Sequence, residues 1–127
     1  MVPEALAAAE SLAEDDGVDA TVLVLSSPDR LFHEWQRART APLRGETPHR
    51  SHLEALVPEG ERDLPIVTVI DGSSHALAWL GSALGTRAVA LGVDRFGQTG
   101  SQPEVYAEHE IDAASIVTAA LVALEPA

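Results

Sequence analysis

The sequence contains no cysteine and no lysine, and aromatic residues make up only 4% of its 127 residues. Without cysteine, disulfide bonds, thiolate metal sites and cysteine nucleophiles are excluded. The lack of lysine also excludes a P-loop, because that phosphate-binding motif requires a lysine after its glycines. With so few aromatic residues, the hydrophobic core must consist mostly of alanine, valine and leucine.

Negative charge dominates, with 20 acidic residues against 8 arginines and a net charge of −12. Nucleic acid and anionic membrane surfaces require a basic face, so we expect neither as a partner. The N-terminus lacks the basic and apolar regions of a signal peptide, and no apolar run approaches the roughly 20 residues needed to cross a bilayer. We therefore expect a cytoplasmic protein, with a single domain over residues 1–127.

Apolar periodicity predicts helices that alternate with strands. Helices are expected over Pro3–Asp15, from Pro28 onward, over His49–Leu56, over His75–Leu84, after Ser101 and over Ala113–Leu124. Strands are expected over Asp19–Leu25, Ile66–Ile70 and Ala88–Val93. The uncharged run Thr21–Leu25 is typical of a strand that is buried on both faces of a parallel sheet. This order predicts an α/β fold with three α/β/α layers and a mainly parallel sheet.

Two polar turns follow the second and third predicted strands, at the end of the sheet where open α/β folds usually carry function. The turn Asp71–His75 contains Asp, Ser and His, but a hydrolase triad needs these groups to converge from separate loops. The G-x-S-x-G spacing is absent as well. We therefore expect Ser73 or Ser74 to cap the following helix.

The other turn, Asp94–Gly97, has two interpretations. In one it is a docking loop for another domain or subunit, with Arg95 as the polar anchor and Phe96 as the apolar anchor. In the other it is a self-contained turn in which Phe96 packs under its own strand. Gly97 supplies backbone freedom in both. The candidate interface residues are Asp94, Arg95, Phe96 and Gly97, and the sequence predicts no catalytic, cofactor-binding or metal-binding residue.

The histidines give no clear metal site. His49 and His52 are three apart, a spacing that can place two imidazoles on one helical face. No third ligand of fixed spacing follows, so we interpret them as a solvated helix start. His33 and His109 are expected at the surface.

The pattern Leu91-Gly92-x-Asp94-x-Phe96-Gly97, then a Ser-headed helix and Ile111-Asp112 before an Ala/Val-rich helix, resembles the C-terminal domain of the transketolase superfamily. The homodimeric E1 component of pyruvate dehydrogenase is the most similar branch, and transketolase itself is the alternative. The Ala/Glu-rich start leading through Gly17-Val18-Asp19-Ala20 resembles E1 as well. Gln98 and Thr99 depart from E1, which tends to have Arg and Ser there.

The resemblance covers nearly the whole chain and implies a supporting role in a larger enzyme. In that family a strand precedes the first helix and lies inside the sheet, so we expect this first parallel strand to be missing and the chain to be a fragment of a longer polypeptide. Thiamine diphosphate and Mg²⁺ are held there by the two preceding domains, and the G-D-G and Glu motifs that bind the cofactor do not occur here.

The resemblance therefore implies a structural and dimerisation domain that is inactive alone. Its expected partners are the remaining domains of a thiamine-dependent enzyme and further copies in a homo-oligomer. A free-standing protein-binding module that reuses the fold is the alternative from another class. A small hydrolase built on Asp71–His75 ranks below both.

Overall fold

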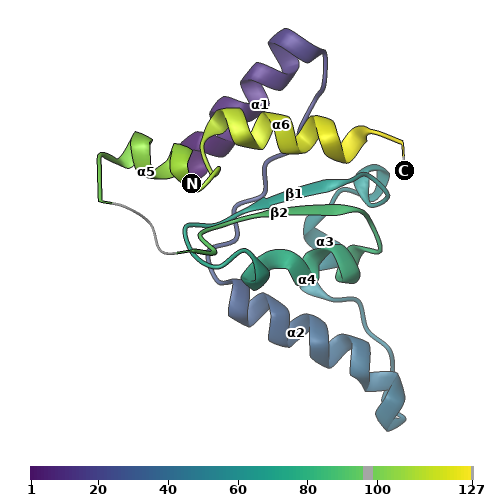
Figure 1. Cartoon of the computed structure of the whole chain (residues 1–127). Helices are drawn as coiled ribbons and strands as arrows, with labels where there is room; N and C mark the ends of the chain where they lie inside the picture. Colours follow the sequence, from purple (N-terminus) through teal and green to yellow (C-terminus); the bar gives the residue numbers. More distant parts are fainter. Residues whose placement is uncertain (96–98, 127) are drawn as a thin grey trace.

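A small parallel sheet lies between two layers of helices in the computed structural model, which describes residues 1–95 and 99–126 (Figure 1). The helices are α1 (Val2–Asp16), α2 (Pro28–Thr40), α3 (His52–Leu56), α4 (His75–Leu84), α5 (Gln102–Glu108) and α6 (Ala113–Leu124), with short 3₁₀ turns η1 (Ala41–Arg44) and η2 (Glu59–Glu61). The strands β1 (Ile66–Val69) and β2 (Ala88–Leu91) pair in parallel, with Ile66 opposite Ala88. The expected α/β class with a parallel sheet is confirmed.

One face of the sheet is covered by α6, with α1 packed against it (Figure 1). The α6 sequence carries no charge and is rich in alanine, whose small side chain lets the helix lie close to the strands. The buried residues of this layer are Ala8, Leu12, Ile116, Ala119 and Ala123. The Glu4 carboxylate accepts a hydrogen bond from the backbone N–H of Ala113 at 2.8 Å, which joins the N-terminal turns of the two helices.

The opposite face is covered by α2, α3 and α4 (Figure 1). The main core cluster lies here and consists of Leu31, Leu53, Val57, Leu77 and Leu80. The short helix α3 is held by a reciprocal capping box: Ser51 Oγ accepts from the N–H of Glu54 at 3.3 Å, and Glu54 Oε2 accepts from the N–H of Ser51 at 2.9 Å. A helix this short has little stability of its own, so the cap and the burial of Leu53 hold it in place.

Most predicted helices are observed within one or two residues of their expected ends. The bounds of α4 and α6 are those that the periodicity predicts. Gly17 and Gly85 end α1 and α4 in the left-handed conformation, with φ of 66° and 64°. Left-handed backbone strains residues that carry a Cβ, so these stops are the ones that the glycines indicate.

The prediction for His109 is wrong, because this residue is buried with 8% of its surface exposed. The chain turns back sharply at the end of α5, where Glu110 has a φ of 57° and the N–H of Ile111 donates to the carbonyl of Tyr106 at 2.9 Å. This turn covers His109, while the two flanking glutamates stay exposed.

The predicted strand over Asp19–Leu25 is also wrong, since these residues form no strand and the sheet has two strands in the described part of the chain. A strand requires a hydrogen-bonded neighbour, and none of the backbone hydrogen bonds between described residues involves residues 19–25. The run therefore crosses from the α1 layer to the α2 layer as an extended connection (Figure 1).

Within residues 1–95 and 99–126, every helix is too short or too polar to cross a membrane.

Candidate functional site

The two turns at the carboxyl end of the sheet are bound to each other. The backbone N–H of Val93, just after β2, donates to the carbonyl of Gly72, just after β1, at 2.6 Å. Gly92 lies under the other turn, because a Cβ at this position would come within 2.5 Å of the nitrogen of Ser74 and 2.6 Å of the carbonyl oxygen of Gly72. These are backbone atoms that cannot rotate away, so the contact requires glycine at position 92.

Asp94 completes this connection from the second turn. Its Oδ1 accepts a hydrogen bond from the N–H of Ser74 at 2.8 Å, at the start of α4. The carboxylate therefore caps α4 in place of the serine side chains that the sequence predicts as caps, since Ser74 makes no side-chain cap bond. The hydrogen bond from the Ser74 backbone, together with the hydroxyls of Ser74 and Ser73 and the charge of His75, lowers the pKa of Asp94 from its ordinary value of 3.8.

Ser73, His75 and Asp94 come together here, but not as a hydrolase triad. Ser73 Oγ lies 2.7 Å from His75 Nδ1 and 3.4 Å from Asp94 Oδ1, so both partners share the one serine hydroxyl. A triad instead places the carboxylate on the far nitrogen of the imidazole. The N–H of Ser74, the nearest candidate for an oxyanion donor, is already bound to the Asp94 carboxylate. The trio therefore stabilises the turns.

Arg95 also binds within its own chain. Its Nη2 donates to the backbone carbonyl of Glu108 at the end of α5 and lies 3.4 Å from the carboxylate of the same residue. Asp94 and Arg95 thus connect the start of the second turn to α4 and α5. The other two candidate interface residues, Phe96 and Gly97, lie outside the described residues.

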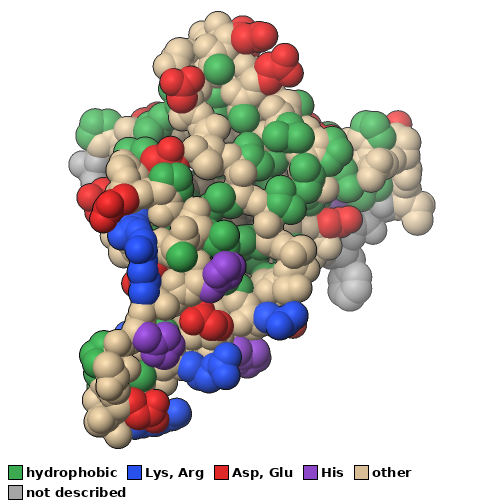
Figure 2. All heavy atoms as spheres, turned by 180° about the vertical axis from the view of Figure 1, so that it is seen from behind, with side chains coloured by type: hydrophobic (Ala, Val, Ile, Leu, Met, Phe, Trp, Pro, Cys, Tyr) green, Lys and Arg blue, Asp and Glu red, His purple; other side chains and the backbone are tan. Residues whose placement is uncertain are grey.

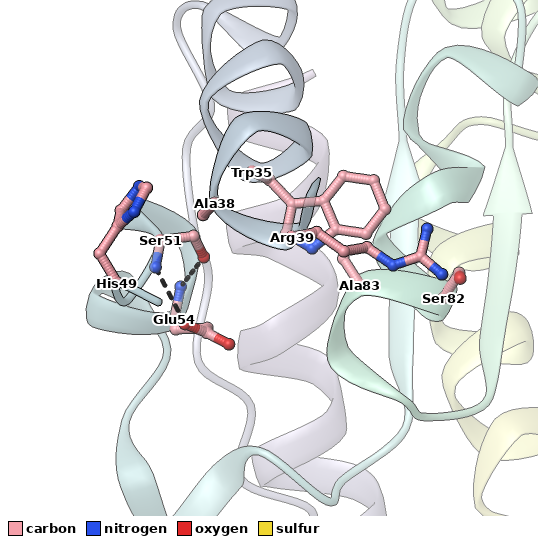
Figure 3. Close-up of a pocket in the computed structure, with 8 residues that line it drawn as sticks. All are labelled: Trp35, Ala38, Arg39, His49, Ser51, Glu54, Ser82 and Ala83. Atoms are coloured by element: carbon pink, nitrogen blue, oxygen red, sulfur yellow. Dashed lines mark hydrogen bonds between the residues drawn. The ribbon is translucent and has the colours of Figure 1, made fainter. Parts of the chain in front are cut away.

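A shallow hollow of about 260 Å³ opens between α2, α3 and α4 (Figure 3). Its lining residues are Trp35, Ala38, Arg39, His49, Ser51, Glu54, Ser82 and Ala83. Figure 3 shows Trp35 and Arg39 reaching from α2 toward α4, while Ser51 and Glu54 bind each other in the α3 capping box. The polar side chains of the hollow are therefore largely engaged with their own neighbours.

Three of the five Phe, Trp and Tyr residues of the chain form one cluster beside this hollow. The ring centroids of Trp35 and Trp79 lie 5.3 Å apart, and Phe32 contacts both. The guanidinium of Arg39 lies 5.6 Å from the ring centroid of Trp35, within the range of a cation–π interaction. All three aromatic residues remain partly exposed.

Charge is distributed unevenly over the molecule. Residues 30–52 contain five of the eight arginines and three of the five histidines but only two glutamates, whereas the rest of the chain contains eighteen acidic residues and three arginines. Figure 2 shows these basic and histidine side chains gathered at the end of the molecule away from the acidic α1. The whole-chain charge therefore hides a basic region around α2.

His49 and His52 both meet Glu34 of α2. The Nε2 of His49 lies 4.0 Å from Glu34 Oε1, and the backbone N–H of His52 donates to Glu34 Oε2 at 2.8 Å. No group of three or more His, Cys, Asp or Glu side chains that could hold a metal occurs in the described part of the chain. The two histidines lie at an exposed start of a helix, in agreement with the solvated interpretation.

Sequence reasoning missed two of these features. The capping box at Ser51 and Glu54 was readable, because Ser-x-x-Glu before an apolar residue is its signature. The convergence of Asp94 on Ser74 was not readable, because the two residues are 20 apart and meet only through the pairing of β1 with β2.

Comparisons of the chain with protein-family models, with curated proteins and with solved structures gave no match.

Proposed function

We propose that this chain is a non-catalytic assembly domain of a thiamine diphosphate-dependent enzyme, of the pyruvate dehydrogenase E1 type within the transketolase superfamily. In this proposal it is a transketolase C-terminal-like domain whose sheet lacks its first parallel strand. The family assignment depends on the resemblance carried by Gly92, Asp94 and the helices that follow. The assembly role depends on the surface of the molecule.

The amount of exposed surface is the observation that carries the assembly role. The chain exposes 8191 Å², and its mass is 13.4 kDa. A compact monomer of this mass exposes about 6,500 Å², so the excess is about 1,700 Å². An excess of this size on one chain matches the area that permanent, obligate interfaces remove from each partner. This excess supports the proposal of a subunit or domain that packs against another.

The apolar side chains at the surface support the same role. Among residues 1–95 and 99–126, ten large hydrophobic side chains are exposed, including Leu43 at 83%, Val24 at 61% and Leu6 at 54%. Single exposed leucines are common, but a chain with so few aromatic residues and so many exposed branched side chains loses much of its possible core. Burial against a partner would recover that hydrophobic stabilisation.

The polar groups at the carboxyl end of the sheet support a structural use of this end. The Asp94 carboxylate, the Ser73 hydroxyl and the Ser74 amide are bound to one another, and Arg95 is bound to α5. A diphosphate with its magnesium ion requires free oxygen ligands and amide donors. The described residues at this end do not fit that requirement, so in this proposal the cofactor is bound by other parts of the parent enzyme.

The test is complementation of an enzyme that lacks its own last domain. We expect the chain to form a stoichiometric complex with a pyruvate dehydrogenase E1 truncated before that domain, and to restore its thiamine-dependent decarboxylation. Transketolase truncated at the corresponding place is tested in parallel. If the chain binds and restores transketolase better than E1, the parent enzyme is a transketolase. Calorimetric titration of the isolated chain with thiamine diphosphate and Mg²⁺ should give no binding heat.

Two results would contradict the proposal. Thiamine diphosphate binding to the isolated chain would place the cofactor site within it. If the folded chain associates with neither truncated enzyme, the proposal that it belongs to a thiamine-dependent enzyme is contradicted. The alternative of a free-standing protein-binding module would then be favoured.

A further inference from the structure

β1 has one edge that no described residue pairs with. The amides of Ile66 and Ile70 donate to Arg87 and Leu91 on the β2 side, at 2.9 and 3.2 Å. Because backbone groups alternate along a strand, the N–H and C=O groups of Val67 and Val69 point to the opposite side. We call these groups the free edge of β1. None of the hydrogen bonds between described residues reaches it.

The chain also holds a strand-forming segment without a sheet. The donor run, Thr21–Leu25, is TVLVL, which combines β-branched residues with leucine and carries no charge. Its middle is exposed, with 43% of Leu23 and 61% of Val24 accessible. Its two ends are held by its own chain: Thr21 Oγ1 donates to Glu61 Oε1 at 3.0 Å, and Leu25 packs against the core cluster.

An unpaired strand edge and an exposed apolar run together make an unstable surface. Each unpaired backbone group that becomes buried costs free energy, and an open edge pairs readily with another extended chain. One added strand satisfies the groups of both segments and covers the exposed leucine and valine. A single molecule therefore presents both a strand donor and a strand acceptor.

We propose that the occupant of the free edge is a second copy of this chain, whose donor run adds to β1 as a third strand. This inference rests on the assembly role proposed above and does not depend on the thiamine-dependent parent. The exposed-area excess of about 1,700 Å² per chain is sufficient for a stable dimer. The donor run brings no carboxylate to the sheet.

The first test is the oligomeric state of the full chain, measured by light scattering and by analytical ultracentrifugation over a dilution series. We expect the wild-type chain to be a dimer. Val24→Glu should raise the dissociation constant of this dimer about 30-fold or more, because the loss of binding free energy from burying the glutamate between two strands equals that from truncating a hot-spot residue. Leu43→Glu is the matched control. Leu43 is also an exposed apolar residue but lies in η1, which belongs neither to the donor run nor to β1, so we expect this variant to leave the dissociation constant of the strand-exchanged dimer unchanged.

The second test uses the absence of cysteine, which allows engineered thiols to report one contact at a time. One chain carries Val22→Cys or Leu23→Cys, and another carries Val67→Cys or Thr68→Cys, so that the four mixtures cover both faces of the added strand. Oxidation of at least one mixture gives a mixed disulfide dimer. This readout does not depend on the stability of the Val24→Glu variant.

Three outcomes would overturn the inference. If the wild-type chain is monomeric, no second copy occupies the free edge of β1. If Val24→Glu does not weaken the dimer and none of the four mixtures forms a disulfide, the dimer uses another surface. That result would contradict strand addition but not the proposed assembly role. The third is seen in a chain that carries one cysteine of each pair: a disulfide that forms within this chain, while none of the four mixtures cross-links, means that the donor run closes onto its own β1.

Discussion

The carboxyl end of the sheet and the free edge of β1 belong to the same strand, yet one is closed and the other is open. At the carboxyl end, Gly92 lies against the backbone of Ser74, and Asp94 binds the same residue. Along the free edge, Val67 and Val69 have no hydrogen-bond partner within the described chain. The difference shows that the turns are completed by residues close to the strand ends, whereas the edge requires a separate segment to arrive.

The closed end provides the largest expected effect. Gly92→Ala places a methyl group within 2.5–2.7 Å of the nitrogen and Cα of Ser74 and of the carbonyl oxygen of Gly72. Both turns must separate, which breaks the bond from Val93 to Gly72 and displaces Asp94. We expect the free energy of unfolding to fall by on the order of 3 kcal/mol, measured by urea denaturation.

Gly60→Ala is the control for that measurement, because a Cβ at position 60 meets nothing within 4 Å. We expect its effect to stay within about 0.5 kcal/mol. If the two alanine variants are equally stable, the two turns are not in contact and the contrast with the free edge disappears.

The free edge should be visible in hydrogen exchange of the isolated chain at low concentration. The amides of Thr68 and Ile70 point to β2, while those of Val67 and Val69 do not. We expect the two valine amides to exchange more than about tenfold faster than their neighbours, because an unpaired amide exchanges without opening of the sheet. The difference should shrink as the concentration rises and the second copy binds. Equal protection along β1 in dilute protein would mean that the edge is already paired.

The contrast also explains what the sequence predicts well. The bounds of α4 and α6 follow from periodicity, and the stops at Gly17 and Gly85 follow from the backbone freedom of glycine. These signals act within one or two turns of the chain. The capping box of α5 is also local: Glu104, three residues after Ser101, accepts a hydrogen bond from the N–H of Ser101 at 3.1 Å.

The errors come from long-range effects. TVLVL has a strong strand pattern, but a strand exists only where a partner is paired, and pairing is not encoded in the run itself. His109 carries flanking charges typical of a surface position and is buried by a turn that its neighbours do not announce. The connection from Asp94 to Ser74 likewise depends on which strands are adjacent. Local chemistry was predictable, and contacts across the sheet were not.

A smaller effect is expected inside the sheet, at Thr68. This residue shares a strand face with Ile66 and Ile70, which pack on the apolar core cluster, and its buried Oγ1 has no hydrogen-bond partner among the described residues. Thr68→Val replaces the hydroxyl by a methyl group of similar size. We expect the free energy of unfolding to rise by about 1 kcal/mol, because an unsatisfied buried hydroxyl is removed.

The Thr68→Val measurement belongs at protein concentrations below dimerisation, where the sheet has only its own two strands. Thr118→Val, at an exposed threonine of α6 that donates to the carbonyl of Ala114, is the control and should not gain stability. A loss of stability in Thr68→Val would mean that the hydroxyl has a partner in solution.

The smallest effect tests the carboxyl end through its charge. Hydrogen bonds from Ser74 lower the pKa of Asp94 in the folded chain, so between that lowered pKa and 3.8 the unfolded chain binds the additional proton. The stability that Asp94 supplies is therefore complete above the ordinary pKa and is lost as the pH falls through the folded pKa. Asp94→Asn should flatten the decline of unfolding free energy as the pH falls through the ordinary pKa of Asp94 and then through its lowered folded pKa, measured by urea midpoints. If unfolding free energy depends on pH in the same way for the wild-type chain and for Asp94→Asn, Asp94 does not bind the Ser74 amide in solution. The contact of Gly92 with the other turn would then be what closes this end.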